Sequence, residues 1–143
     1  MIGRSLETVS LRMNRAAESA SKIAECLANH SRIGEIFHPE HIADERYRDV
    51  YARQCSGAGS TFSFNISGER ADVFSVLNKL KIFKLAVSLG GSESLVCHPS
   101  STIHSGVDRH LREQLQITES LVRISIGLEH PDDLIADLHQ ALA

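Results

Sequence analysis

The stretch LAVSLGGSESLVCHP, residues 85–99, determines how we expect the rest of the chain to be organised. An apolar run leads into Ser88, the pair Gly90-Gly91 follows, and a second apolar run ends before a His-Pro pair. Paired glycines favour a tight reversal because they accept positive φ at no steric cost. We therefore predict two short strands that meet at this reversal and leave the Ser88 hydroxyl at an edge.

A second stretch, LVRISIGLE at 121–129, carries β-branched residues at every second position. This period is typical of a half-buried strand, and it places Arg123 on the face opposite the apolar residues. A guanidinium can bind a carboxylate through two parallel hydrogen bonds. Ser88 and Arg123 are thus candidates for binding a small carboxylate. Composition alone favours the alternative that this is an ordinary polar sheet face in contact with water.

These stretches also carry a family resemblance. SLGGSESLVCHPSSTIH and LVRISIGLEHPDDLIADLHQAL resemble the C-terminal domain of the cystathionine γ-synthase/γ-lyase family, the pyridoxal-phosphate (PLP) enzymes of cysteine and methionine metabolism. The most similar branch is methionine γ-lyase. Further matches in SLETVSLRMNRAAESASKIAECL, RQCSGAGSTFSFNI and LNKLKIFKLAVS extend the resemblance over nearly the whole chain.

The resemblance implies roles for three residues. Ser88 and Arg123 match the serine and the arginine that hold the substrate α-carboxylate in the family. Val87 occupies a specificity position that is often Glu in synthase-like and cystathionine-cleaving members, and a valine there resembles the methionine γ-lyase branch. The segment PSSTIH at 99–104 departs from the family's usual PASMTH, so no role is carried over to that loop.

The resemblance implies PLP as cofactor, which a lysine holds as a Schiff base. The lysines are Lys22, Lys79, Lys81 and Lys84, and none lies in the S-x-T-K setting where the family carries its cofactor lysine. We therefore expect no catalytic residue in this chain, no stable PLP binding by the chain alone, and no reaction without a partner. The expected partner is a large PLP-binding domain or another subunit.

Composition indicates an ordinary globular domain. The chain has 143 residues, 42% of them hydrophobic and 23% charged, which suits one domain with a real core. A net charge of -3 gives no electrostatic reason to bind nucleic acid or an anionic membrane. No signal peptide is recognisable, and the odd set of Cys26, Cys55 and Cys97 favours reduced, buried thiols in the cytoplasm.

Periodicity predicts an α/β (α+β) sandwich, a mostly antiparallel sheet with helices covering one face. Ser5 is the expected N-cap of the first helix. The family resemblance implies a division of the chain into 1–30, a long helix of the interdomain type, and 31–143, a C-terminal substrate-side domain. The predicted helices are 5–29, 44–54, 69–80, 108–116 and a last one from Pro131; the predicted strands are 32–37, 60–66, 81–88, 92–98 and 121–127.

Eight histidines raise the question of a metal site. His98 and His104 lie close to Cys97 in sequence but lack ligand spacing, so we predict no metal. The histidines expected to face water are His38, His41, His110, His130 and His139.

The resulting hypothesis is that this chain is the carboxylate-binding part of a PLP-dependent lyase or transferase. Its substrate would be a sulfur-containing amino acid, in α,γ-elimination of methionine or in transsulfuration. The resemblance also implies a homo-oligomer, a tetramer in the family. Two alternatives remain open: a non-catalytic domain that binds an amino acid or a protein partner, and a truncated product without a function of its own.

Overall fold

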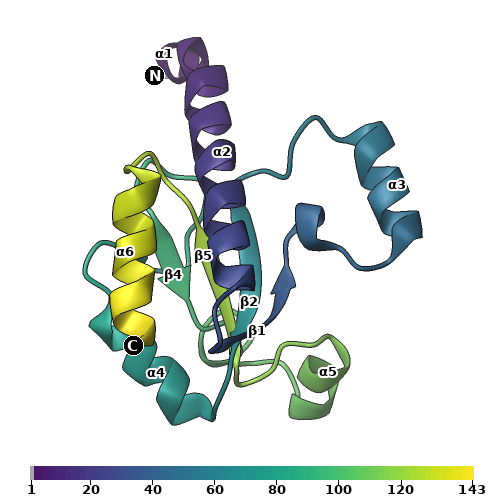
Figure 1. The fold of residues 1–143 in the computed structure, drawn as a ribbon, viewed down its shortest axis with the longest axis vertical. Coiled ribbons are helices and arrows are strands. Elements are labelled where there is room, and N and C mark those ends of the chain that lie inside the picture. The colour runs from purple at the N-terminus through teal and green to yellow at the C-terminus, as the bar shows by residue number, and fades with distance from the viewer. Residues whose placement is uncertain (1) are drawn as a thin grey trace.

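The structure, a computed structural model, describes residues 2–143. Within these residues the strands form one sheet in the order β1-β2-β5-β4-β3 (Figure 1). All neighbouring strands are antiparallel except β3 and β4, which are parallel. The predicted mostly antiparallel α/β sheet is confirmed. The strands are β1 (Ile33–Phe37), β2 (Thr61–Ile66), β3 (Lys84–Leu85), β4 (Leu95–Cys97) and β5 (Leu121–Ser125).

Helices α2, α4 and α6 pack together on one face of the sheet, whereas α3 stands away from it (Figure 1). Pro131 begins α6, where its missing N–H costs no hydrogen bond. The helices are α1 (Ile2–Glu7), α2 (Val9–Ala28), α3 (Glu45–Gln54), α4 (Arg70–Lys79), α5 (Arg109–Gln114) and α6 (Pro131–Leu142), with short 3-10 turns at Pro39–His41 and Pro99–Ser101.

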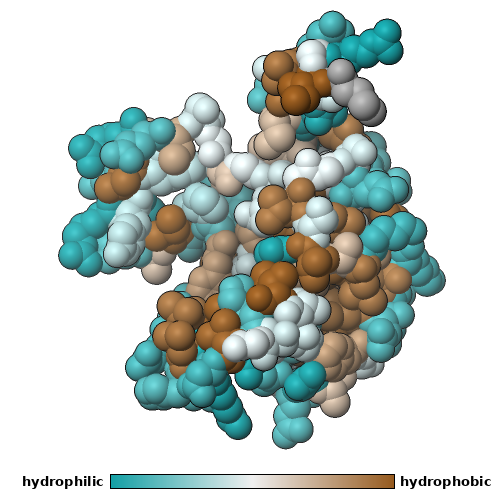
Figure 2. Space-filling model, turned by 180° about the vertical axis from the view of Figure 1, so that it is seen from behind, coloured by the Kyte–Doolittle hydropathy of each residue, from teal (hydrophilic) through white to brown (hydrophobic). Residues whose placement is uncertain are grey.

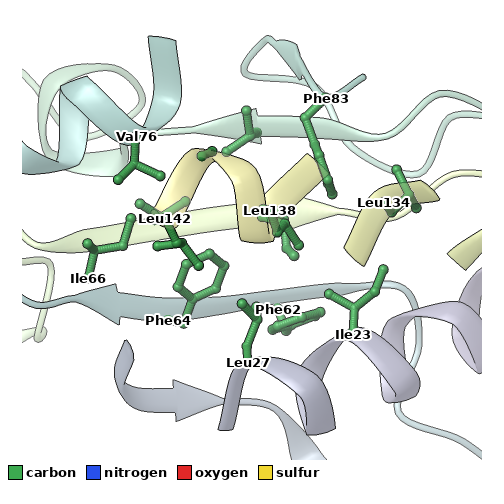
Figure 3. Packing of buried hydrophobic residues seen from close by; sticks show 14 of the residues in the cluster. Ile23, Leu27, Phe62, Phe64, Ile66, Val76, Phe83, Leu134, Leu138 and Leu142 are labelled. Atoms are coloured by element: carbon green, nitrogen blue, oxygen red, sulfur yellow. The ribbon is translucent and has the colours of Figure 1, made fainter. Parts of the chain in front are cut away.

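The core lies between the sheet and these helices. Phe62 and Phe64 on β2 point to the same side as Val122 and Ile124 on β5, and all four are buried. Figure 3 shows these strands facing apolar side chains of α2 and α6. The alternation of the sequence therefore fixes which face of the sheet receives the helices. The labelled helical partners include Ile23, Leu27, Leu134, Leu138 and Leu142.

The first predicted helix is wrong at its N-terminal end. Ser5 is not an N-cap, because α1 already begins at Ile2 and the helix is interrupted at Thr8. The Arg12 side chain donates to the Ser5 carbonyl at 2.7 Å and to the Thr8 hydroxyl at 3.2 Å. A side chain thus occupies a carbonyl that the next helical turn would otherwise use. The proposed division at residue 30 stays a prediction.

The predicted hairpin around the glycine pair is also wrong. Strands β3 and β4 are shorter than expected and run parallel, with Lys84 opposite Leu95. Residues 86–94 form a wide loop, since hydrogen bonds from other elements, described below, draw the loop across the end of β5. Before β3, the buried carboxylate of Asp137 on α6 accepts from the backbone N–H groups of Lys81 (2.9 Å), Ile82 (2.7 Å) and Phe83 (3.3 Å).

Two predictions of exposure fail. His38 is only 1% exposed, because its ring packs edge-on against Phe62 with ring centroids 5.1 Å apart. Its Nδ1 accepts from the Glu40 N–H at 3.3 Å and so caps the following 3-10 turn. Cys55, expected to be buried, is exposed, whereas Cys97 is buried as predicted.

Helix α1 and the start of α2 project beyond the sheet (Figure 1), and none of the α1 residues is buried. Apolar surface appears at this projection and again across the rear of the molecule (Figure 2). No helix within residues 2–143 is long and apolar enough to cross a membrane. The exposed large apolar residues at the projection are Ile2, Leu6, Val9, Leu11 and Met13.

Replacing Asp137 by Ala should lower the free energy of unfolding by roughly 2–3 kcal/mol, because it removes a charged acceptor and leaves backbone donors unpaired. Urea denaturation of the purified chain measures this loss. The control is Asp133→Ala on the exposed part of the same helix, where only a helix-dipole effect of at most about 1 kcal/mol is expected. Equal losses in both variants would contradict the role of Asp137.

His38 should make the fold less stable in acid. Burial lowers the pKa of the His38 imidazole, an effect that Glu40 opposes and His41 reinforces. The unfolded chain then binds the proton more readily, so stability is full above about pH 6.5 and falls as the pH drops through the folded pKa. In His38→Asn, which keeps an acceptor for the turn, the free energy of unfolding should decline less steeply below that pH. The exposed His110→Asn is the control; a wild-type slope in both variants would refute the prediction.

Candidate functional site

Arg123 lies in the middle of β5, opposite Ser63 on β2 and Cys97 on β4. Its side chain leaves the sheet on the face away from Val122 and Ile124, as the alternation predicts. The other side chains of β5 on this face are not in water, since Leu121 is 7% and Ser125 only 1% exposed. For β5, the alternative of an ordinary water-facing polar surface is therefore wrong.

The structure brings Arg123 next to Ser88. The Arg123 Nη2 group donates to the backbone carbonyl of Val87 at 2.9 Å and to that of Ser88 at 3.1 Å. The sequence predicted the proximity of the two residues but not that main-chain carbonyls would mediate it. These two bonds hold the guanidinium in one orientation beside an exposed loop.

The guanidinium keeps capacity for a further ligand. Within residues 2–143, no acceptor pairs with the Arg123 Nε or Nη1 groups, and no carboxylate forms an ion pair with them. The Ser88 hydroxyl has no hydrogen-bond partner in the same part of the chain. Neutral carbonyls orient the cation without neutralising it, so the arrangement suits an incoming anion.

The far end of the loop is fixed by Glu129 and Ser94, which sequence reasoning missed. The Glu129 carboxylate accepts from the Ser94 N–H and from the Ser94 hydroxyl, both at 2.8 Å. The hydroxyl in turn accepts from the Gly127 N–H at 2.9 Å. Glu129 lies two residues after the conspicuous VRISIG stretch, but no periodic signal links it to a serine 35 residues earlier.

A cavity of about 300 Å³ lies beside Val87 on the α4 side, and Arg123 is not among its lining residues. Val87 therefore belongs to the loop that contacts Arg123 and also lines this mostly apolar cavity. It is 56% exposed. The lining residues also include Phe74, Leu77, Leu85, Val96 and His98.

The chain offers poor attachment for a covalently held cofactor. All four lysines, Lys22, Lys79, Lys81 and Lys84, are exposed, and none lines the cavity beside Val87. Among residues 2–143, no three His, Cys, Asp or Glu side chains are arranged to hold a metal ion. His98 is buried, with its ring nitrogens 2.8 Å from the Ser101 hydroxyl and 2.9 Å from the Glu119 carbonyl.

The sequence model of the Cys/Met metabolism PLP-dependent enzymes matches residues 1–143. The chain belongs to this family. The resemblance seen in the sequence is thereby confirmed.

Relatives within this family catalyse different reactions. The chain is 37% identical over 139 residues to an L-methionine gamma-lyase of Fusobacterium nucleatum subsp. polymorphum, covering 97% of this chain and 35% of that protein. It is 40% identical over 141 residues to a chloroplastic cystathionine beta-lyase of Mimosa pudica, covering 96% and 30%. The chain thus spans about a third of the length of the curated relatives it matches.

A solved structure confirms the fold of this family member. A Campylobacter jejuni protein assigned as an O-acetylhomoserine (thiol)-lyase superposes with a TM-score of 0.90 at 34% identity, covering 97% of this chain and 33% of that one. That protein carries N′-pyridoxyl-lysine-5′-monophosphate. The five-stranded sheet with its helices therefore corresponds to the C-terminal part of a fold-type I PLP enzyme.

Gly127 should tolerate no side chain, because an added Cβ would collide with the Ser92 carbonyl oxygen and the Glu93 backbone. We expect Gly127→Ala to lower the free energy of unfolding by about 1–3 kcal/mol through forced displacement of the loop. Thermal or urea unfolding measures the change. Gly106→Ala is the matched control, since open space surrounds that glycine. A Gly127→Ala chain as stable as the control would contradict the close packing of the loop on the end of β5.

Proposed function

We propose that this chain supplies the α-carboxylate subsite of a PLP-dependent enzyme that acts on a sulfur-containing amino acid. The observation that carries the proposal is the Arg123 guanidinium, which is held by the carbonyls of Val87 and Ser88 while its Nε and Nη1 donors have no partner in residues 2–143. A carboxylate placed there would accept from the guanidinium, and the Ser88 hydroxyl beside it would add a donor.

The contribution of these residues is orientation. A carboxylate fixed at Arg123 and Ser88 limits the rotation of the amino acid. It thereby directs the Cα and the side chain of the amino acid toward the cofactor half of the site. Misplacement by about 1 Å can cost roughly a hundredfold in rate. Val87, at the border of the site, is the proposed specificity position, because its apolar side chain offers no charge to a substrate amine or second carboxylate.

The cofactor half of the site is proposed to lie outside these residues. The exposed lysines give no support for attachment of PLP to this chain. The matched relatives are about three times longer, which leaves room in a complete enzyme for a PLP-binding domain. Reaction type, elimination or replacement, follows from that partner and from the sulfur amino acid bound. Assembly into a homo-oligomer and location in the cytoplasm belong to the same proposal.

The purified chain should bind L-methionine through its carboxylate. In a titration followed by ¹⁵N–¹H NMR, we expect saturable shifts of the amide signals of residues 87–91. L-Methioninol, which has a CH₂OH group in place of the carboxylate, should cause none. Arg123→Ala should weaken binding by roughly 10- to 100-fold, since it removes a charge-assisted pair.

Two further variants sharpen this titration. Arg123→Lys keeps the charge but loses the planar fork, so its affinity should fall between those of wild type and Arg123→Ala. Arg53→Ala, an exposed arginine on α3, is the control and should bind as wild type does. Equal binding of methionine and methioninol, or unchanged affinity in Arg123→Ala, would refute the proposed subsite.

A further inference from the structure

Ser125 forms hydrogen bonds that neither the packing of the sheet nor carboxylate binding alone explains. Its side chain is almost fully buried, at 1% exposure, on the same sheet face as Arg123. The Ser125 Oγ accepts from the Gly90 N–H at 2.9 Å and from the Thr61 hydroxyl at 3.3 Å. A buried hydroxyl on the central strand is thus bonded to the backbone of an exposed loop.

Arg123 and Ser125 act on the same piece of chain because residues two apart on a strand point to the same face. Arg123 binds the loop through the carbonyls of Val87 and Ser88, and Ser125 binds it two residues later through the Gly90 N–H. The backbone carrying Ser88 is therefore fixed on both sides by a single rigid element.

The loop conformation between these two attachments depends on Gly90. Its φ is +73°, in the left-handed region that disfavours residues with a Cβ. No atom lies within 4 Å of the place where a Cβ would stand, so space is available and only the backbone conformation requires glycine. The neighbouring Gly91 has no positive φ and has ordinary room for a Cβ.

From these contacts we propose that Ser125 is a positioning residue: through the Gly90 N–H it holds the Ser88 loop in the geometry that binds the substrate carboxylate. This inference rests on the proposed function, because it assigns a second residue to the same subsite. Ser125 itself does not touch the carboxylate. It acts by keeping the Ser88 hydroxyl within reach of the group that Arg123 binds.

A Gly90 substitution distinguishes a positioning role of Ser125 from a purely structural one. Loss of a buried hydroxyl affects stability as well as the loop, whereas Gly90 is exposed and contributes little to the core. Gly90→Ala strains the turn without removing a buried contact, and Gly91→Ala adds the same methyl group one residue later without strain. The two glycine variants thus separate loop geometry from stability.

The experiment repeats the L-methionine titration on the full chain with Ser125→Ala, Gly90→Ala, Gly91→Ala and Ser63→Ala. Ser63 is a serine on the adjacent strand, opposite Arg123. We expect Ser125→Ala and Gly90→Ala to weaken affinity roughly fivefold to tenfold. The first removes the hydrogen bond to the loop and the second disfavours the left-handed conformation at residue 90, so each lowers the population of the binding-competent loop. The other two should stay within about twofold of wild type. Gly90→Ala should lower the unfolding midpoint less than Ser125→Ala does, because its strain is confined to an exposed loop.

The Gly90 amide provides a direct signature of the bond. In Ser125→Ala its proton resonance should move upfield and exchange faster with solvent, while the Arg123 side-chain signals persist. Wild-type affinity in both Ser125→Ala and Gly90→Ala, with carboxylate-dependent binding intact in the wild type, would overturn the positioning role alone. Absence of carboxylate-dependent binding in the wild type would overturn the proposed function, and the positioning role with it.

Discussion

The structure depends on one strand, β5, that is buried on both faces. Its β-branched residues fill the core beneath α2 and α6, and its opposite face attaches the loop that carries Ser88. Both neighbours of β5 are antiparallel, so its backbone is hydrogen-bonded on either side. Because core and site share this strand, any shift of β5 that relaxes the packing also moves the guanidinium.

The polar contacts around the site have a common character. Each charged side chain is held by neutral groups: Arg123 by backbone carbonyls, and Asp137 and Glu129 by backbone N–H groups. Such bonds fix geometry yet leave the charge of Arg123 uncompensated within residues 2–143. A guanidinium with a carboxylate partner of its own would have to release that partner before it could bind another acid. Within residues 2–143, no carboxylate has to leave the free donors of Arg123.

The sequence predicted what depends on local periodicity. The alternation in β2 and β5, the stripe on α6 and the side from which Arg123 projects were all readable, because each repeats within a few residues. What failed depends on partners far away in sequence. The glycine pair indicated a hairpin, but the Gly90 N–H bonds to Ser125, 35 residues later. His38 was predicted to lie at the surface, but Phe62, which is distant in sequence, covers it.

The position of β5 in the chain has a consequence for biosynthesis. Within this sheet the central strand β5 is translated after the other four strands, so until it is made the sheet consists of two separate pairs, β1 with β2 and β3 with β4. The sheet can therefore close only after residue 125 has left the ribosome, and until then the edge of β2 that pairs with β5 lacks its partner strand and is open to aggregation.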